Sequence, residues 1–200
     1  PNLEGTSRLS PYLTLGIISS RRSIQKSYEQ NDKNLIKKNQ GIVKWIDELI
    51  WREFYRNIMH LNPKVSKNQP FKDSTKNIHW RYDEDQFQSW CEGQTGFPII
   101  DAAMRQLKHE GWMHNRLRMV VAMFFSKNMF HDWRLGEKFF MENLIDGDFS
   151  SNNGGWQWSA STGTDAAPYF RIFNPTSQSE KFDKTGAFIR RYVPELKDLN

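Results

Sequence analysis

The sequence predicts an all-α fold. Apolar residues recur at three- and four-residue steps through residues 42–61, which is the period of an amphipathic helix. No segment alternates apolar and polar residues as a half-buried strand does, and no rhythm of alternating strands and helices is visible. Neither a G-x-G-x-x-G fingerprint nor a Walker phosphate-binding loop is present, so dinucleotide folds of those types are not supported.

The composition is typical of a soluble globular protein. The 200 residues are 38% hydrophobic and 26% charged, enough for one domain with a core over residues 1–200. The formal net charge of +5 permits nucleic-acid binding without requiring it. The single Cys91 excludes an internal disulfide, and no His/Cys cluster surrounds it, so no metal site is expected. No signal peptide or long apolar run is present, so we expect a cytoplasmic monomer without a membrane partner.

Seven helices are expected, with recognisable ends. Ser19 or Ser20 is a natural N-cap for the first helix, Pro63 follows the end of the second, and Gly111 closes the fourth. They cover residues 19 or 20 to 30, 42–61, 83–91, 98–109, 112–130, 133–144 and 180–192, with irregular or turn-rich segments at 31–40, 62–82 and 161–178.

The N-terminal residues 1–18 are rich in turn formers. Within Gly5–Pro11, small hydroxyl residues stand beside Arg8, a composition suited to an anion-binding nest. A plain loop has the same composition, so both interpretations stay open.

Residues of unlike chemistry share one face of the helix expected over 42–61. They are Trp45, Glu48, Leu49, Arg52 and Tyr55. Glu48 and Arg52 are four residues apart and can pair on a helix. A carboxylate and a guanidinium among aromatic residues are costly unless they are paired or used. This face is therefore either a partly buried ion pair or the wall of a site.

The helix expected over 112–130 carries polar side chains in its first turns. Asn115 and Arg118 share a face, whereas Arg116 points elsewhere. Cations near the start of a helix oppose its dipole unless an anion meets them. The pattern therefore favours a bound phosphate or an acidic partner.

The stretch Asp146–Trp158 shows neither helical nor strand spacing. Two acids flank Gly147, two amides precede two glycines, and two tryptophans follow. Glycines allow positive φ and the close approach of a ligand, and flat indole rings can stack. We interpret the stretch as a rigid ligand-binding loop. A polar loop whose tryptophans fill the core is the alternative.

Six segments, in order along the chain, resemble the photolyase/cryptochrome family. They are Thr6–Ser10, Glu48–Tyr55, Thr95–Pro98, Trp112–Met119, Asp146–Trp158 and Thr164–Pro175. The resemblance covers nearly the whole chain and is greatest to class I photolyases, which repair cyclobutane pyrimidine dimers. His114 and Asn115 stand where (6-4) photolyases usually have two histidines, and Asn152 stands where plant cryptochromes usually have Asp.

The resemblance implies a helical FAD-binding domain with a U-shaped FAD among its helices. Asn152 would face the flavin N5, where an amide can donate or accept, and Arg118 would pair with Asp146 near the ring. The N-terminal loop would hold the phosphates. The residues implied to bind the cofactor are Thr6, Ser7, Arg8, Leu9, Ser10, Trp45, Asn115, Arg118, Asp146, Gly147, Asp148 and Asn152.

The implied activity is light-driven repair of pyrimidine dimers in UV-damaged DNA. Excited, fully reduced anionic FAD would pass an electron to a flipped-out dimer, whose cyclobutane ring would split before the electron returned. Glu48 would hydrogen-bond the dimer between Trp51 and Trp158, and stacking a base on an aromatic ring is worth about 1–3 kcal/mol. The residues implied to bind the substrate are Glu48, Trp51, Arg52, Asn115, Arg116, Trp158 and Gln178.

The residues implied to take part in the chemistry are Glu48, Asn152, Trp156, Trp133 and Trp80. The three tryptophans match the family's electron-transfer chain from flavin to surface, which reduces an oxidised flavin under light. Without the resemblance, Trp133 and Trp156 would be core residues and Trp80 a half-exposed one.

Some parts of the family's architecture are missing from the sequence. They are the N-terminal α/β domain that can hold a folate or deazaflavin antenna, the segment just before Thr6, and the usual C-terminus, and their loss would weaken FAD binding by this chain. Two other functions stay open. One is a cryptochrome-like blue-light photoreceptor without repair activity, and the other is a basic helical DNA-binding module without a cofactor.

Overall fold

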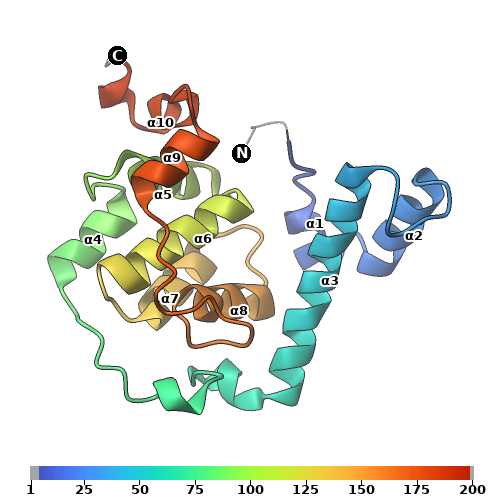
Figure 1. Cartoon of the computed structure of the whole chain (residues 1–200), viewed down its shortest axis with the longest axis horizontal. Coiled ribbons are helices and arrows are strands. Elements are labelled where there is room, and N and C mark those ends of the chain that lie inside the picture. Colours follow the sequence, from blue (N-terminus) through green and yellow to red (C-terminus); the bar gives the residue numbers. More distant parts are fainter. Residues whose placement is uncertain (1–4, 199–200) are drawn as a thin grey trace.

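Helices joined by loops make up residues 5–198, the part of the chain that the computed structural model describes (Figure 1). No strand occurs among these residues, and their one isolated β-bridge joins Arg81 and His131. The all-α prediction is therefore confirmed. The helices are α1 Ser10–Thr14, α2 Ser20–Gln30, α3 Gln40–Leu61, α4 Glu84–Glu92, α5 Pro98–Glu110, α6 Asn115–Met123, α7 Trp133–Asn143, α8 Phe149–Ser159, α9 Pro175–Phe182 and α10 Ala187–Tyr192. Short 3-10 turns lie at Pro63–Lys67, Asp73–Thr75 and Pro194–Leu196, and a π-helical turn at Phe124–Asn128.

The expected helix ends follow from capping residues. Ser19 caps α2 by accepting a hydrogen bond from the backbone N–H of Arg22 at 3.1 Å. Gly111 ends α5 with a φ of 63°, a conformation that glycine adopts without strain. Both caps were predicted from the sequence.

The stretch expected as a loop at Asp146–Trp158 is mostly helical, so that prediction was wrong. Asp148 is the N-cap of α8 and accepts from the backbone N–H and the hydroxyl of Ser151, each at 3.0 Å. The helix continues through two glycines whose surroundings differ. Gly154 packs against Tyr55 of α3, and Gly155 lines a cavity.

Three other boundaries differ from the prediction. The N-terminal loop contains the short helix α1, which the buried Leu13 anchors. Helix α6 begins at Asn115 rather than near Trp112, because Nδ1 of His114 accepts from the backbone N–H of Arg116 at 3.0 Å and caps it. The last expected helix is two helices. Asp183 ends α9, and its carboxylate accepts from the first backbone N–H groups of α10.

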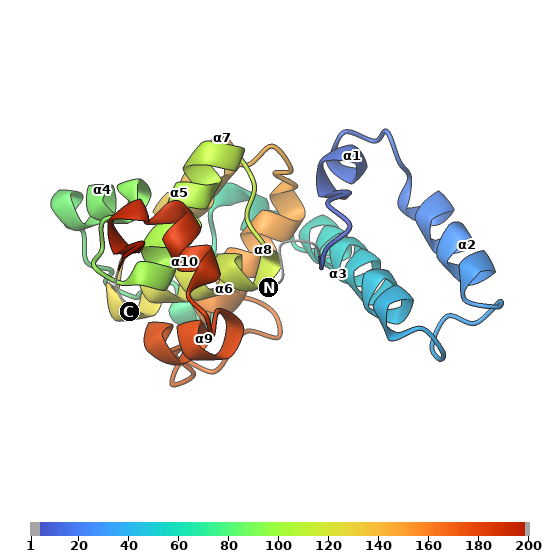
Figure 2. The same cartoon turned by 90° about the horizontal axis from the view of Figure 1, so that it is seen from above.

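The first three helices stand to one side of the rest, as two views at right angles show (Figures 1 and 2). Helix α3 joins the two parts by packing on α8. In the larger part the core contains the fully buried indoles of Trp90, Trp133 and Trp156. Among residues 5–198, none of the helices combines the length and the apolar character that crossing a bilayer requires.

Candidate functional site

Two neighbouring cavities share a wall formed by Asn115, Arg118 and Met119 of α6. The larger, of about 670 Å³, lies between the N-terminal loop, α3 and the start of α6. The smaller, of about 140 Å³, lies between α6, α7 and α8. Every residue expected to bind the cofactor lines one or both. Thr6, Ser7, Arg8, Leu9, Ser10 and Trp45 line the larger, Asp146, Gly147, Asp148 and Asn152 the smaller, and Asn115 and Arg118 both.

A buried ion pair stands where the two cavities meet. Nη2 of Arg118 donates to both carboxylate oxygens of Asp146, at 2.9 and 2.8 Å, and the Asp146 side chain is only 2% exposed. Nε of Arg118 donates to the backbone carbonyl of Met113 at 2.8 Å, which fixes the guanidinium. The pairing of Arg118 with Asp146 is therefore confirmed.

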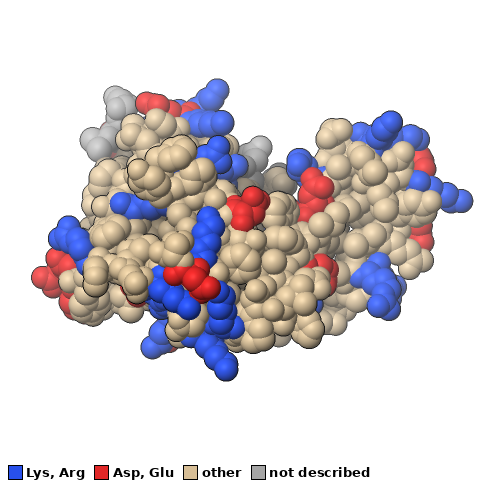
Figure 3. All heavy atoms as spheres, turned by 60° about the horizontal axis from the view of Figure 1, so that its bottom comes forward, with Lys and Arg blue, Asp and Glu red and all other residues tan. Residues whose placement is uncertain are grey.

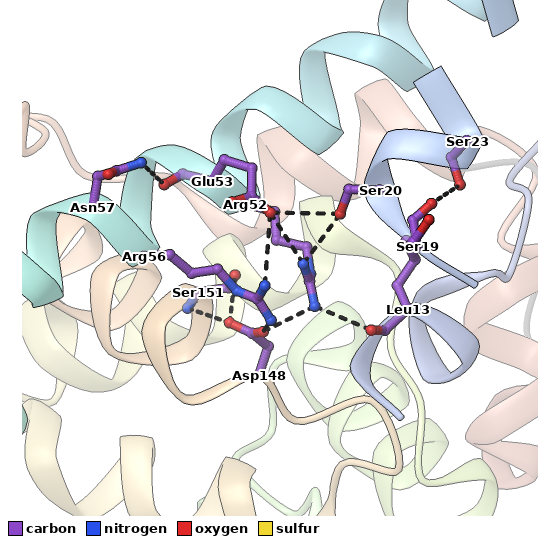
Figure 4. Close-up of polar contacts among 10 residues, drawn as sticks. All are labelled: Leu13, Ser19, Ser20, Ser23, Arg52, Glu53, Arg56, Asn57, Asp148 and Ser151. Carbon is purple, nitrogen blue, oxygen red and sulfur yellow. Dashed lines mark hydrogen bonds and ion pairs between the residues drawn. The ribbon is translucent and has the colours of Figure 1, made fainter. Parts of the chain in front are cut away.

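A second cluster of charges ties α8 to α3 (Figure 4). The carboxylate of Asp148 pairs with Arg56 at 3.0 Å and with Arg52 at 3.4 Å. Burial favours a higher pKa for Asp148, but hydrogen bonds from Ser151 and Arg56 and the charge of Arg52 hold this pKa below its ordinary value. Asp148 is therefore an ionised structural anchor at the edge of the smaller cavity.

Arg52 pairs with acids other than Glu48. Its guanidinium lies against Asp148 and Glu53 and also donates to the backbone carbonyl of Leu13 at 3.1 Å. The interpretation of Glu48 and Arg52 as an ion pair was wrong, because Arg52 turns toward α8 and α1 (Figure 4). The role of Arg52 at DNA stays a prediction, although its side chain is only 13% exposed.

The N-terminal loop folds against the end of α5. Arg8 has a positive φ of 52°, and its guanidinium lies 4.8 Å from the ring centre of Trp112. The indole N–H of Trp112 donates to Oγ of Ser10 at 3.4 Å. The hydroxyl of Thr6 is buried and has no partner within the protein. This cationic loop with an unused hydroxyl is suited to a bound anion.

Buried polar atoms without partners also occur at the smaller cavity. They are Oγ of Ser159 and Nε1 of Trp156, both on residues that line it. A Cβ added to Gly155 would meet no heavy atom within 4 Å, so open space lies beside this glycine. The larger cavity is therefore lined by a cationic loop. The smaller cavity has open space and polar groups without hydrogen-bond partners. The ion pair of Arg118 with Asp146 lies where the two cavities meet. These residues fit FAD, which has phosphates at its centre and a planar polar ring at one end.

Asn152 lines the smaller cavity, and a hydrogen bond to the backbone of α7 holds its side chain. Its side-chain amide donates to the backbone carbonyl of Glu137 at 2.9 Å. Glu137 is 5% exposed, and burial raises the pKa of its carboxyl even though amides of Asn153 and Asn152 partly oppose the shift. The sequence gives no signal for Glu137, which looks like any acid of an amphipathic helix.

Some of the side chains expected to meet the dimer line the larger cavity. Glu48 and Arg116 line it. Burial, followed by the charge of Asp47, raises the pKa of Glu48. Trp51 is 45% exposed, and its ring contacts are with Phe54 and Tyr55 of its own helix.

Phe173 connects two expected DNA contacts that lie far apart in sequence. Its ring centre lies 5.9 Å from the guanidinium of Arg116 and 6.5 Å from the ring centre of Trp158. Gln178 lies in α9 with its side-chain carbonyl oxygen buried and without a partner in the protein. Phe173 was not among the residues expected in the site, although it lies at the end of an aromatic segment.

His114 also lines the larger cavity and was missed as a functional residue. Burial, followed by positive charges that include Arg116 and Arg118, lowers the pKa of His114 to about 4. Its imidazole is therefore neutral at pH 7. Since Nδ1 accepts the capping hydrogen bond, the ring proton is on Nε2.

The three tryptophans of the implied electron-transfer chain lie at different depths. Trp156 and Trp133 are buried, and Trp80 is half-buried against Phe130 at 5.3 Å between ring centres. The ring contacts of Trp156 are with Trp90, Phe125 and Phe140. The electron-transfer chain thus stays a prediction. The burial of the three tryptophans is compatible with a path from the interior to the surface.

One group of positive charges lies in a segment that lines neither of the two cavities. Residues 62–82 hold five of the chain's cations against one acid, Asp73. Lys64 and Lys76 both pair with Asp73, and Figure 3 shows cations gathered on the side of the molecule that lies at the bottom of Figure 1. In the site itself, Arg52 and Arg118 are paired with acids.

Comparisons with known proteins agree with this geometry. Residues 45–200 match the family described as the FAD binding domain of DNA photolyase. The chain is 54% identical over 200 residues to the deoxyribodipyrimidine photo-lyase of Vibrio cholerae, and 54% identical over 199 residues to that of Escherichia coli. Each match covers 100% of this chain but 42% of the relative. The chain therefore spans about two fifths of the length of these relatives.

Solved structures show the same fold. A class III photolyase from Agrobacterium tumefaciens superposes with a TM-score of 0.90 at 43% identity, over 98% of this chain and 40% of the other. A cryptochrome from Synechocystis superposes with a TM-score of 0.85 at 39% identity, over 97% of this chain and 39% of the other. The fold is thus shared by repair enzymes and by a cryptochrome.

Proposed function

The chain belongs to the family of FAD binding domains of DNA photolyases, and on this premise we propose that it binds FAD and repairs cyclobutane pyrimidine dimers in UV-damaged DNA under light. The 54% identity to two deoxyribodipyrimidine photo-lyases supports this activity. The single Cys91, which is buried as a free thiol, supports a reducing compartment such as the cytoplasm.

One observation carries the proposal. The cavities that hold the expected cofactor residues are joined through α6, and Glu48 and Arg116 line the larger of them. A dimer that enters beside Glu48 would therefore share a cavity with the cofactor. This closeness is what direct electron transfer from a flavin to a dimer requires.

FAD, if bound in its reduced form, would supply light-driven one-electron chemistry to the dimer, with the electron returned once the two cyclobutane carbon–carbon bonds are broken. The residues of this chain bind and orient. Thr6 and Arg8 would hold the phosphates, while Arg118, paired with Asp146, would lie beside the ring and help to balance its charge. Asn152, fixed by the carbonyl of Glu137, would present its amide to the ring edge.

Glu48 would recognise the dimer. Because burial raises its pKa, its carboxyl keeps a proton to a higher pH than an exposed glutamate does and can donate a hydrogen bond to a pyrimidine carbonyl. Trp51 and Trp158 would offer stacking faces, and Arg116, Arg52 and Gln178 would contact the strand around the lesion.

The test is the light-dependent loss of dimers from irradiated oligothymidine, measured with the full-length protein, reduced FAD and blue light. The proposal predicts repair that needs light and is weakened in Glu48→Ala. Absence of light-dependent repair by the reduced wild-type protein would sink it.

A cryptochrome-like photoreceptor is the second candidate, favoured by the similarity to the Synechocystis cryptochrome. It would share the FAD site and the tryptophans but not the repair. Under that function the reduced protein leaves dimers intact, and Glu48→Ala leaves the light response of the flavin unchanged.

A further inference from the structure

An exposed aromatic segment projects from the body after α8. In residues 167–173, Tyr169 is 81% exposed and Phe170 is 74% exposed, and their rings contact each other at 5.9 Å between centres. The backbone N–H of Arg171 donates to the carbonyl of Pro168 at 2.9 Å, which closes a turn around the two rings. Since both rings are mostly exposed, their burial contributes little to fixing this turn.

Lys127 holds this turn from a distant part of the chain. Its ammonium donates to the backbone carbonyls of Pro168 and Arg171, each at 3.0 Å, across 41 and 44 residues of sequence. Lys127 lies in the π-helical turn Phe124–Asn128 that follows α6. Such turns are rare and often occur at functional sites, because they re-aim side chains out of the regular helical register.

The ammonium of Lys127 is partly buried and has therefore lost part of its hydration. Burial, followed by the nearby charge of Arg171, lowers the pKa of the Lys127 ammonium to about 8. A partly buried ammonium needs acceptors to offset its lost hydration, and the two carbonyls supply them. Lys127 thus connects the π-helical turn Phe124–Asn128 to the turn at residues 168–171 and is not a freely solvated surface lysine.

Both ends of the segment connect to expected DNA contacts. At its start, the backbone N–H of Ala167 donates to the carbonyl of Trp158 at 3.2 Å. At its end, the ring of Phe173 contacts both the guanidinium of Arg116 and the indole of Trp158. A shift of the turn would therefore move Phe173 and the two side chains that it contacts.

We propose that Lys127 is a positioning residue that fixes the segment 167–173, and through Phe173 sets Arg116 and Trp158 for lesion binding. The part about lesion binding rests on the proposed function. Lys127 itself contacts neither the cavities nor the residues assigned to the dimer.

The first experiment measures the order of the turn by limited proteolysis and does not depend on a repair assay. Chymotrypsin cleaves after exposed aromatic residues, so Tyr169 and Phe170 report on the turn, and Tyr82, which is 64% exposed in another loop, is an internal control. Lys127→Met should speed cleavage after Tyr169 and Phe170 about tenfold, the scale expected for the loss of two hydrogen bonds from a local opening equilibrium. Cleavage after Tyr82 should not change.

Two further variants make the test specific. Lys127→Arg keeps the charge and the donors and should restore slow cleavage. Lys138→Met removes a lysine that is 74% exposed on α7 and should behave like the wild type. Unchanged cleavage in Lys127→Met would overturn the proposal. Faster cleavage at Tyr82 as well, with a lowered melting temperature, would also overturn it, since it would mean general destabilisation.

The second experiment uses the full-length protein loaded with FAD. Lys127→Met should raise the Kd for dimer-containing DNA several-fold and leave the repair yield of bound dimers unchanged, because the cofactor residues are untouched. Selective loosening of the turn with an unchanged Kd would refute the link to lesion binding. If the wild type repairs no dimers, the proposed function fails, while the cleavage pattern still decides whether Lys127 holds the turn.

Discussion

Gly154 of α8 lies directly against Tyr55 of α3. A Cβ at residue 154 would stand 2.1 Å from Cδ1 and 2.7 Å from Cγ of the Tyr55 ring, and these atoms lie at the base of a side chain that cannot move aside cheaply. The close approach joins the helix that carries Glu48 to the helix that carries Asn152. It thus fixes the position of the helix of Glu48 relative to the helix of Asn152.

Gly154→Ala should therefore destabilise the fold. Overpacking between α3 and α8 costs roughly 1–3 kcal/mol, set against a gain in helix propensity of about 1 kcal/mol. Denaturant unfolding followed by circular dichroism measures the change. A variant as stable as the wild type would show that the two helices are not in this contact.

Gly155→Leu should lower the flavin content and leave the stability of the fold unchanged. A Cβ at residue 155 meets nothing within 4 Å, and leucine is a good helix former, so stability should be kept. The larger side chain should instead fill space in the smaller cavity that the flavin ring needs. The flavin-to-protein ratio after purification should fall while the melting temperature of the FAD-free protein holds. Normal flavin content in this variant would place the ring elsewhere.

Arg118→Met should destabilise strongly, because it leaves the carboxylate of Asp146 buried without its partner. Breaking a buried pair in this way typically costs about 3–5 kcal/mol of unfolding free energy. Adding Asp146→Asn to the variant should recover part of the loss, since the orphaned charge is then removed. If the double variant is no more stable than Arg118→Met, the cost lies in packing and not in the ion pair.

Lesion binding should depend on pH through Glu48. Burial raises the pKa of this carboxyl above the ordinary 4.5, so the protonated donor dominates below the raised pKa and is lost as pH rises through it. Affinity for dimer-containing DNA should thus fall with rising pH above 4.5. Glu48→Gln keeps a donor at every pH and should flatten that dependence. A wild-type profile as flat as that of the glutamine variant would contradict a protonated Glu48.

The tryptophan chain gives a prediction with a matched control. Trp133→Phe should abolish the photoreduction of oxidised flavin and leave dimer repair intact once the flavin is reduced chemically. Trp90→Phe removes another fully buried indole that is not in the chain and should keep photoreduction. Photoreduction is measured by the flavin absorbance under blue light. Equal photoreduction in the two variants would show that Trp133 is not part of the electron-transfer path.

Much of the fold was predictable because local signals agree with tertiary packing. Ser19 and Gly111 mark helix ends by capping chemistry alone, and the apolar period of α3 is strong. Helix α8 was not predictable in this way, because its glycines and amides lower helix propensity. It forms because Gly154 meets Tyr55, while the amides of Asn153 and Gln157 hydrogen-bond each other inside the fold.

The site was predictable to the extent that its residues sit in motifs. The pairing of Arg118 with Asp146 followed from the family resemblance. The partner of Arg52 did not, because spacing on one helix favoured Glu48 and only the packing of α8 brings Asp148 within reach. The contacts of Phe173, Lys127 and Glu137 are with distant segments, which no local pattern records.

The most direct measurement is the visible spectrum of the purified full-length protein, recorded before and after blue light in the presence of a reductant. The joined cavities predict a bound flavin whose oxidised absorbance band bleaches under light, and whose content falls in Gly155→Leu. A wild-type protein that stays colourless after incubation with excess FAD would contradict the account.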